Sequence, residues 1–212
     1  MVFYLSDLYT LLLIFSLLIF SALVFFERDR FFLLIEHAIN RKYSLIYHKQ
    51  DNIIYNVFTA LNNLMIISII ASFYIFHIKG IMSFFVFIKI SLTLFVFFII
   101  RMAIIYAIGI LFESIETIKR YYYTYCTNLH FISLFFFPII FFVSYFEQGV
   151  FINNISIYIY YFFILFYFIL KIILFRRLNV LSIPFMLYNI LYLCAVEILP
   201  YLVLWKLLNN IN

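Results

Sequence analysis

A single carboxylate lies within the last apolar run of the chain. Glu197 stands three residues before Pro200 in the run Val180–Leu207, which contains no other acidic residue. An ionisable group in hydrocarbon costs about 2.5–3.5 kcal/mol on insertion scales, so it is expected to have a partner or a function. Pro200 cannot donate a hydrogen bond to the carbonyl four residues earlier, which leaves a backbone acceptor beside Glu197. We interpret this turn as a polar site inside a membrane.

Lys89 is the predicted partner of this carboxylate. Each residue lies about nine or ten positions from one end of its apolar run, and these two ends face the same side of the membrane. At 1.5 Å per residue, this spacing corresponds to a depth of about 13–15 Å. With Asn189, the pair would line a small polar pocket. Two interpretations are open: a proton relay, ion relay or ligand site, and a structural lock between two helices. A Lys89 side chain that extends to the surface would leave the pair unformed.

The elements that position these residues are membrane spans. Hydrophobic residues make up 68% of the 212 residues and charged residues 11%, against about 45–50% and about 25% in soluble domains. A spanning helix needs about 20 mostly apolar residues, and continuous runs, unlike alternating ones, exclude a β-barrel. The sequence therefore predicts one all-α domain over residues 1–212, a polytopic transmembrane helix bundle of about six spans. The runs are Leu8–Phe26, Ile53–Phe76, Ile81–Ile100, Leu129–Phe146, Ile155–Leu174 and Val180–Leu207.

Basic residues predict the orientation of these spans. The connections 27–52, 101–128 and 171–179 hold eleven Lys and Arg residues, whereas the opposite side has only Lys79 and Lys206. By the positive-inside rule the first set is cytoplasmic and both termini face outward. The first run has no cationic region before it and no small-residue cleavage site after it, so we expect it to be a retained span.

Two cytoplasmic segments are predicted to form amphipathic helices at the membrane interface, Phe31–Gln50 and Leu111–Asn128. Both mix apolar residues with charges, as interfacial helices do, and Glu116 and Arg120 have the i,i+4 spacing of a helical ion pair. A solvated charged face is one interpretation; a docking surface for a membrane or cytoplasmic protein partner is the other. The candidate residues of this surface are Glu113, Glu116, Lys119, Arg120, Arg41 and Lys42.

Other polar residues in the runs have simpler explanations. Asn52, Asn56 and Asn63 recur on one helical face, which is typical of hydrogen bonds between membrane helices; a solute path is the alternative. His77 and His130 are predicted on opposite sides of the membrane, which argues against a shared haem or metal site. The run from Tyr121 to Tyr125 is typical of an interfacial aromatic belt.

The sequence predicts no catalytic residue, no cofactor and no nucleic-acid partner. It contains no phosphate loop, no nucleotide fingerprint, no H-E-x-x-H and no nucleophile elbow, so an enzyme has no residue set to support it. The net charge of +5 is dispersed among the ends of the spans, whereas a nucleic-acid surface gathers its basic residues on one face. The predicted partner is the lipid bilayer.

The closing segment Leu191-Tyr-Leu-Cys-Ala-Val-Glu197-Ile-Leu-Pro200, followed by a Lys, resembles the signature of an uncharacterised Bacteroidota membrane family, domain of unknown function 4271. The segment Ile110–Glu113, Asn128 and Pro138 fit this resemblance, which covers roughly residues 8–208. It implies a bacterial inner-membrane protein and brings no activity or cofactor. Frequent Phe (31) and Tyr (19) indicate an AT-rich genome.

Three functions follow from these features. The first is a non-catalytic scaffold or accessory subunit of a cell-envelope complex, because charged cytoplasmic segments accompany an absence of catalytic constellations. The second is a small proton- or ion-coupled transporter that uses Glu197. The third is an organelle-encoded respiratory-chain or ATP-synthase membrane subunit, suggested by composition alone. Such a proton-channel subunit needs an arginine inside the membrane, and the sequence predicts Arg101 at the cytoplasmic edge.

Overall fold

The chain folds into a bundle of α-helices. The computed structural model describes residues 5–35, 52–79, 83–111, 115–146, 151–177 and 199–209. Within these ranges every residue is helical except Glu27, Asn52 and Ser83, which lie at helix boundaries. The predicted all-α transmembrane bundle is confirmed for this part of the chain.

Five of the helices are long and apolar enough to cross a membrane. They overlap the first five predicted spans, although the third and fourth have different bounds. The sixth predicted span lies mostly outside the described residues; its described part belongs to an apolar helix of 11 residues that ends at Asn209, two residues beyond the predicted span. The bounds are α1 (Leu5–Phe26), α2 (Arg28–Ile35), α4 (Ile53–Lys79), α5 (Phe84–Leu111), α6 (Ile115–Phe146), α7 (Phe151–Arg177) and α9 (Leu199–Asn209).

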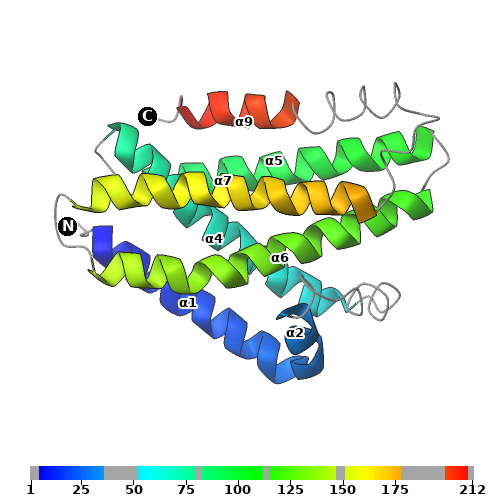
Figure 1. The fold of residues 1–212 in the computed structure, drawn as a ribbon, viewed down its shortest axis with the longest axis horizontal. Helices are drawn as coiled ribbons and strands as arrows, with labels where there is room; N and C mark the ends of the chain where they lie inside the picture. The colour runs from blue at the N-terminus through cyan, green and yellow to red at the C-terminus, as the bar shows by residue number, and fades with distance from the viewer. Residues whose placement is uncertain are drawn as a thin grey trace.

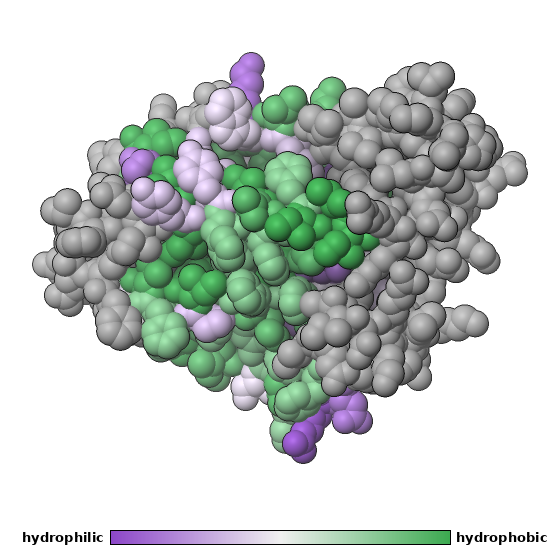
Figure 2. Space-filling model, viewed as in Figure 1, coloured by the Kyte–Doolittle hydropathy of each residue, from purple (hydrophilic) through white to green (hydrophobic). Residues whose placement is uncertain are grey.

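Helix α4 is the central helix of the bundle. It crosses the others obliquely (Figure 1) and contacts α1, α5, α6 and α7. Two-thirds of its span (67%) is buried inside the bundle, whereas α7 buries 17% and α5 22%. Because lipid tails are as apolar as these side chains, the outer helices lose little by leaving one face uncovered. Figure 2 shows the apolar side chains that the described residues present on one face of the bundle.

The two short helices pack at the edges of this bundle. Helix α9 lies along α5, and α2 contacts α1 and α6. The hydrophilic residues at the lower edge of Figure 2 lie over the junction of α1 and α2 in Figure 1. The sequence there is Glu27-Arg28-Asp29-Arg30, which ends the first apolar run.

Side-chain caps fix where two of the spans begin. The Asn52 Oδ1 atom accepts hydrogen bonds from the backbone N–H groups of Ile54 (3.1 Å) and Tyr55 (3.4 Å). The Ser83 Oγ atom accepts one from Val86 (3.3 Å). Asn and Ser are preferred at this position because they satisfy N–H groups that the first helical turn leaves unpaired. The third span therefore begins at Phe84 rather than at Ile81.

The fourth span begins earlier than the sequence predicts. We expected Leu111–Asn128 to lie along the interface and the span to begin at Leu129. Instead α6 runs without a break from Ile115, and its membrane-spanning part extends from Tyr121 to Ser144. Thr124, Thr127 and Asn128 are buried, so the polar side chains that looked interfacial face other helices. Of the other predicted interfacial segment, Phe31–Ile35 belongs to α2 and residues 36–50 lie outside the described ranges.

Candidate functional site

A row of polar side chains on α4 contacts the surrounding helices. We call Asn56, Asn62, Asn63 and Ser72 the α4 polar seam. The Ser16 hydroxyl of α1 donates to Asn62 Oδ1 at 2.6 Å, and His130 Nδ1 of α6 lies 3.3 Å from Asn63 Oδ1. Such bonds between membrane helices are worth about 0.6 kcal/mol each on average and up to about 1.7. The expected hydrogen bonding of Asn56 and Asn63 between helices is confirmed.

The seam continues toward the far end of α4 at Ser72. Its hydroxyl donates to the Ile69 carbonyl at 2.7 Å and lies 2.8 Å from the Tyr9 hydroxyl of α1. Because the single proton of Ser72 is used by the carbonyl, Tyr9 is the donor in the second bond. From Asn56 to Ser72 the seam spans about 24 Å at 1.5 Å per residue.

An arginine contacts the Asn56 end of the α4 polar seam. Arg30 on α2 is 2% exposed. It forms an ion pair with Glu27 (3.2 Å), donates to Asn56 Oδ1 (3.4 Å) and lies over the Tyr55 ring at 4.2 Å. Asn52 also donates to Glu27. These contacts join α2 to the start of α4, because Arg30 of α2 contacts Asn56 and Tyr55 of α4.

We predict that Ser16→Ala lowers the free energy of unfolding by about 1 kcal/mol, because Asn62, which is fully buried, loses its hydrogen-bond donor. The measurement is SDS-induced unfolding of the purified protein in mixed micelles. Ser21→Ala on the exposed part of the same helix is the matched control and should change little. Equal effects of the two substitutions would contradict the prediction.

A second polar group gathers around two buried cations. Arg101 on α5 is 1% exposed and Lys171 on α7 is 7% exposed. Both lie inside helices that are long and apolar enough to span the membrane. Around them are tyrosines from α6, α7 and α9. We call this set the tyrosine–cation cluster, and its members are Arg101, Lys171, Tyr121, Tyr125, Tyr167 and Tyr201.

The Tyr121 hydroxyl oxygen accepts hydrogen bonds from both cations. Arg101 Nη2 donates to the Tyr121 hydroxyl oxygen at 3.3 Å, and Lys171 Nζ donates to the same oxygen at 3.1 Å. The two nitrogens are therefore at most 6.4 Å apart. At an effective dielectric constant of 20, their repulsion is at least roughly 2.5 kcal/mol. The cluster concentrates positive charge that its surroundings must offset.

Aromatic rings offset part of this charge. The Tyr125 ring lies 4.4 Å from the Arg101 guanidinium and 5.0 Å from the Lys171 ammonium. The Tyr201 ring lies 5.1 Å from Arg101, and its hydroxyl is hydrogen-bonded to that of Tyr167. A desolvated cation over an aromatic face gains about 2 kcal/mol. Arg101 thus joins α5 to α6 and α9, and Lys171 joins α7 to α6.

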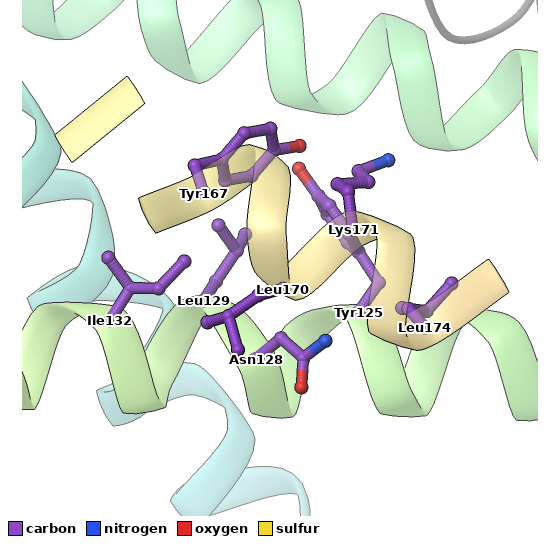
Figure 3. A pocket seen from close by; sticks show the side chains of 8 residues that line it. All are labelled: Tyr125, Asn128, Leu129, Ile132, Tyr167, Leu170, Lys171 and Leu174. Atoms are coloured by element: carbon purple, nitrogen blue, oxygen red, sulfur yellow. The ribbon is translucent and has the colours of Figure 1, made fainter. Parts of the chain in front are cut away.

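A small cavity lies next to Lys171, between α6 and α7. Figure 3 shows the hydroxyls of Tyr125 and Tyr167 and the ammonium of Lys171 directed to the same side, above α7 and toward α5. The cavity volume is about 10 Å³, about the room that one water molecule needs. Its lining is Tyr125, Asn128, Leu129, Ile132, Tyr167, Leu170, Lys171 and Leu174.

The residues that we predicted to form the first polar site are only partly described. Glu197 and Asn189 lie outside the described residues, so their pocket stays a prediction. Lys89 has an exposed side chain on α5, and Pro200 is half-buried as the second residue of α9.

The predicted partner surface is also described only in part. Glu113, Arg41 and Lys42 lie outside the described ranges. Glu116 and Arg120 belong to α6, but their side chains are not described. Lys119 is exposed on the same helix. The use of these residues as a docking surface stays a prediction.

The tyrosine–cation cluster is the site that sequence reasoning missed. Arg101 and Lys171 were counted as cytoplasmic connection residues, and Tyr121 and Tyr125 as an aromatic belt. The available signal was the apolar sequence on both sides of each cation: α5 continues for ten uncharged residues after Arg101, and four apolar residues follow Lys171 before Arg176. A cation at the end of a span has polar residues beyond it, whereas these two have a further apolar turn.

Comparisons with known proteins identify the chain by sequence alone. No curated protein matches it. No solved structure matches it either. The model of the family described as "Domain of unknown function (DUF4271)" matches residues 9–208, which include the α4 polar seam and the tyrosine–cation cluster. The resemblance of the closing segment is thereby confirmed, and the chain belongs to the DUF4271 family.

Proposed function

We propose that this multi-pass membrane protein is a non-catalytic scaffold or accessory subunit of a cell-envelope complex. The observation that supports the proposal is the α4 polar seam. Asn56, Asn62, Asn63 and Ser72 each bond to a residue of another helix. A carrier moves helices past one another during its cycle, and a helix bonded on several sides along its length resists such movement.

The tyrosine–cation cluster supports the same function. Its rings and cations connect four helices, and the cavity beside it has room for about one water molecule. A packed junction of this kind holds helices at fixed positions, as a scaffold requires. We also propose that the protein resides in the inner membrane of a Bacteroidota cell, as the family resemblance implies.

The positive-inside rule supports an orientation with both termini outside. Arg101 and Lys171 are buried within helices and are no longer counted as connection residues. The remaining basic residues are still nine against two. The predicted cytoplasmic side is then the side on which Lys119 lies, and we propose that the partner of the scaffold binds there.

The test is affinity purification of the tagged full-length protein in a mild detergent. A variant with Arg41→Glu, Lys42→Glu and Lys119→Glu is expected to lose most of a stoichiometric partner while its membrane abundance stays normal. Lys206→Glu, at an exposed position on α9, is the matched control and should retain the partner. A wild-type protein that purifies with no partner at all would contradict the scaffold role.

A small proton- or ion-coupled transporter is the second candidate, because two cations are buried inside the membrane bundle and such residues often mark ion pathways. In proteoliposomes with an internal pH dye, a transporter that uses Glu197 should lose proton flux in Glu197→Gln. Equal proton permeability of wild type, Glu197→Gln and protein-free vesicles would exclude proton coupling.

A further inference from the structure

We propose that a water molecule binds between α4 and α6, where it bridges Asn62, His130 and Ser133. Asn62 and Ser133 are fully buried, and His130 is 2% exposed. Among the described residues, three of their polar atoms have no hydrogen-bond partner: Asn62 Nδ2, His130 Nε2 and Ser133 Oγ. A buried polar atom without a partner keeps the full cost of leaving water. Three such atoms at one contact between helices therefore indicate a bound molecule.

Hydrogen bonds place Asn62 and His130 at the same junction of α1, α4 and α6. Asn62 Oδ1 accepts a hydrogen bond from the Ser16 hydroxyl of α1 at 2.6 Å. The next residue of α4, Asn63, has its Oδ1 atom 3.3 Å from His130 Nδ1 of α6. Because a carbonyl oxygen can only accept, His130 Nδ1 is the donor. A charged imidazole is costly in this buried position, so the ring is neutral and its Nε2 atom is an acceptor.

Ser133 lies on the same face of α6 as His130. The centroid of the Phe20 ring of α1 lies 6.1 Å from that of the His130 ring and 5.3 Å from that of the Phe137 ring. Ser133 stands three residues after His130 and four before Phe137, and these spacings place the three side chains on one helical face. The Ser133 hydroxyl therefore belongs to the side of α6 that meets α1 and α4.

The donor and acceptor types of the three atoms favour water over an ion. Asn62 Nδ2 only donates, His130 Nε2 accepts, and the Ser133 hydroxyl can do either. An anion would meet the lone pair of His130, and a cation would meet the amide protons of Asn62. Water both donates and accepts, and a buried water typically makes about three hydrogen bonds to polar groups that are otherwise unpaired. One water molecule thus satisfies all three atoms.

The first measurement is the melting temperature of full-length Ser133→Ala in nanodiscs. If water uses the hydroxyl, the substitution breaks the bridge, and the melting temperature should fall by about 2–4 °C. If the hydroxyl is unpaired, its removal relieves the cost of burying it, and the melting temperature should stay the same or rise. Either of these results would overturn the proposal. Ser68→Ala is the matched control and should change little, because the Ser68 hydroxyl is also buried but bonds to the Leu64 carbonyl of its own helix.

The second measurement detects the water itself by solid-state NMR of the protein in lipid bilayers. With His37, His48 and His77 replaced by Gln and the remaining histidine labelled with ¹⁵N, His130 supplies the only imidazole signals. We expect rapid magnetisation transfer from water protons to this ring, and a severalfold slower transfer once Ser133→Ala is added. No transfer, or equal transfer in both proteins, would overturn the proposal even if the melting temperature falls, because a direct bond between Ser133 and His130 would then explain that fall.

Discussion

Replacing Arg101 by alanine is expected to lower the free energy of unfolding by about 3–5 kcal/mol, the range for truncating a large buried side chain, because the lost ring contacts and the cavity outweigh the relief of its repulsion with Lys171. Arg101 is 1% exposed, donates to Tyr121 and lies over the rings of Tyr125 and Tyr201. The substitution removes these contacts, leaves a cavity and separates α9 from α5. Total stabilities are about 5–15 kcal/mol, so membrane abundance should fall severalfold.

A second arginine, which is exposed, serves as the control that separates the effect of burial from that of the cation–π contact. Arg28 lies over the Phe32 ring at 5.7 Å but is exposed, where a cation–π contact is worth about 0.5–1 kcal/mol. Arg28→Ala should therefore stay near wild type in SDS unfolding. Arg101→Lys should fall between wild type and Arg101→Ala, because an ammonium keeps the charge without the planar face. Equal stability of the two alanine variants would contradict a central role of the cluster.

Phe136→Ala should be the second most damaging substitution, with an expected loss of about 3 kcal/mol. The Phe136 ring on α6 is fully buried and contacts Phe162, Phe163 and Phe166 of α7, with centroid distances of 5.6, 5.3 and 6.0 Å. Replacing a core Phe in a soluble protein costs about 3–5 kcal/mol. Lipid is as apolar as the core, so we expect the lower end of this range from lost contacts and the cavity.

Phe142 provides the matched control for this prediction. It lies on the same helix but is 57% exposed, so lipid tails fill the space when the ring is removed. Phe142→Ala should change the free energy of unfolding by less than about 1 kcal/mol. SDS titration of both variants measures the difference, and similar losses would show that α6 and α7 are not held together by this aromatic contact.

The spans were predictable because hydrocarbon imposes one strong requirement. A continuous apolar run of about 20 residues has few alternatives to a spanning helix, and α1, α4, α5 and α7 lie where those runs predict. The start of α6 was not predictable in the same way. Tyr121, Thr124 and Thr127 are too polar for a lipid-facing helix, and only burial against neighbours makes them part of a span.

The candidate site was predictable in part. Asn56 and Asn63 follow one helical face of α4, so their hydrogen bonds between helices could be inferred before any partner was known. Asn62 lies off that face, and its bond to Ser16 was not predicted. The partners Ser16, His130 and Arg30 come from distant parts of the sequence, and no local pattern indicates which helices meet. Arg101 and Lys171 were assigned to connections because cations are rare in spans. Their burial depends on tyrosines of three other segments, which hydropathy does not reveal.

The position of α4 at the centre of the bundle imposes an order on biogenesis. Asn62 finds its partner Ser16 in a helix made earlier, so α1 and α4 can pair as soon as both have left the translocon. Asn63 must wait for His130, which is made 67 residues later. At 5–20 residues per second that delay is roughly 3–13 s. During this interval the least apolar of the five spans carries an amide in lipid, and retention of α4 by the insertion machinery until α6 arrives would protect it.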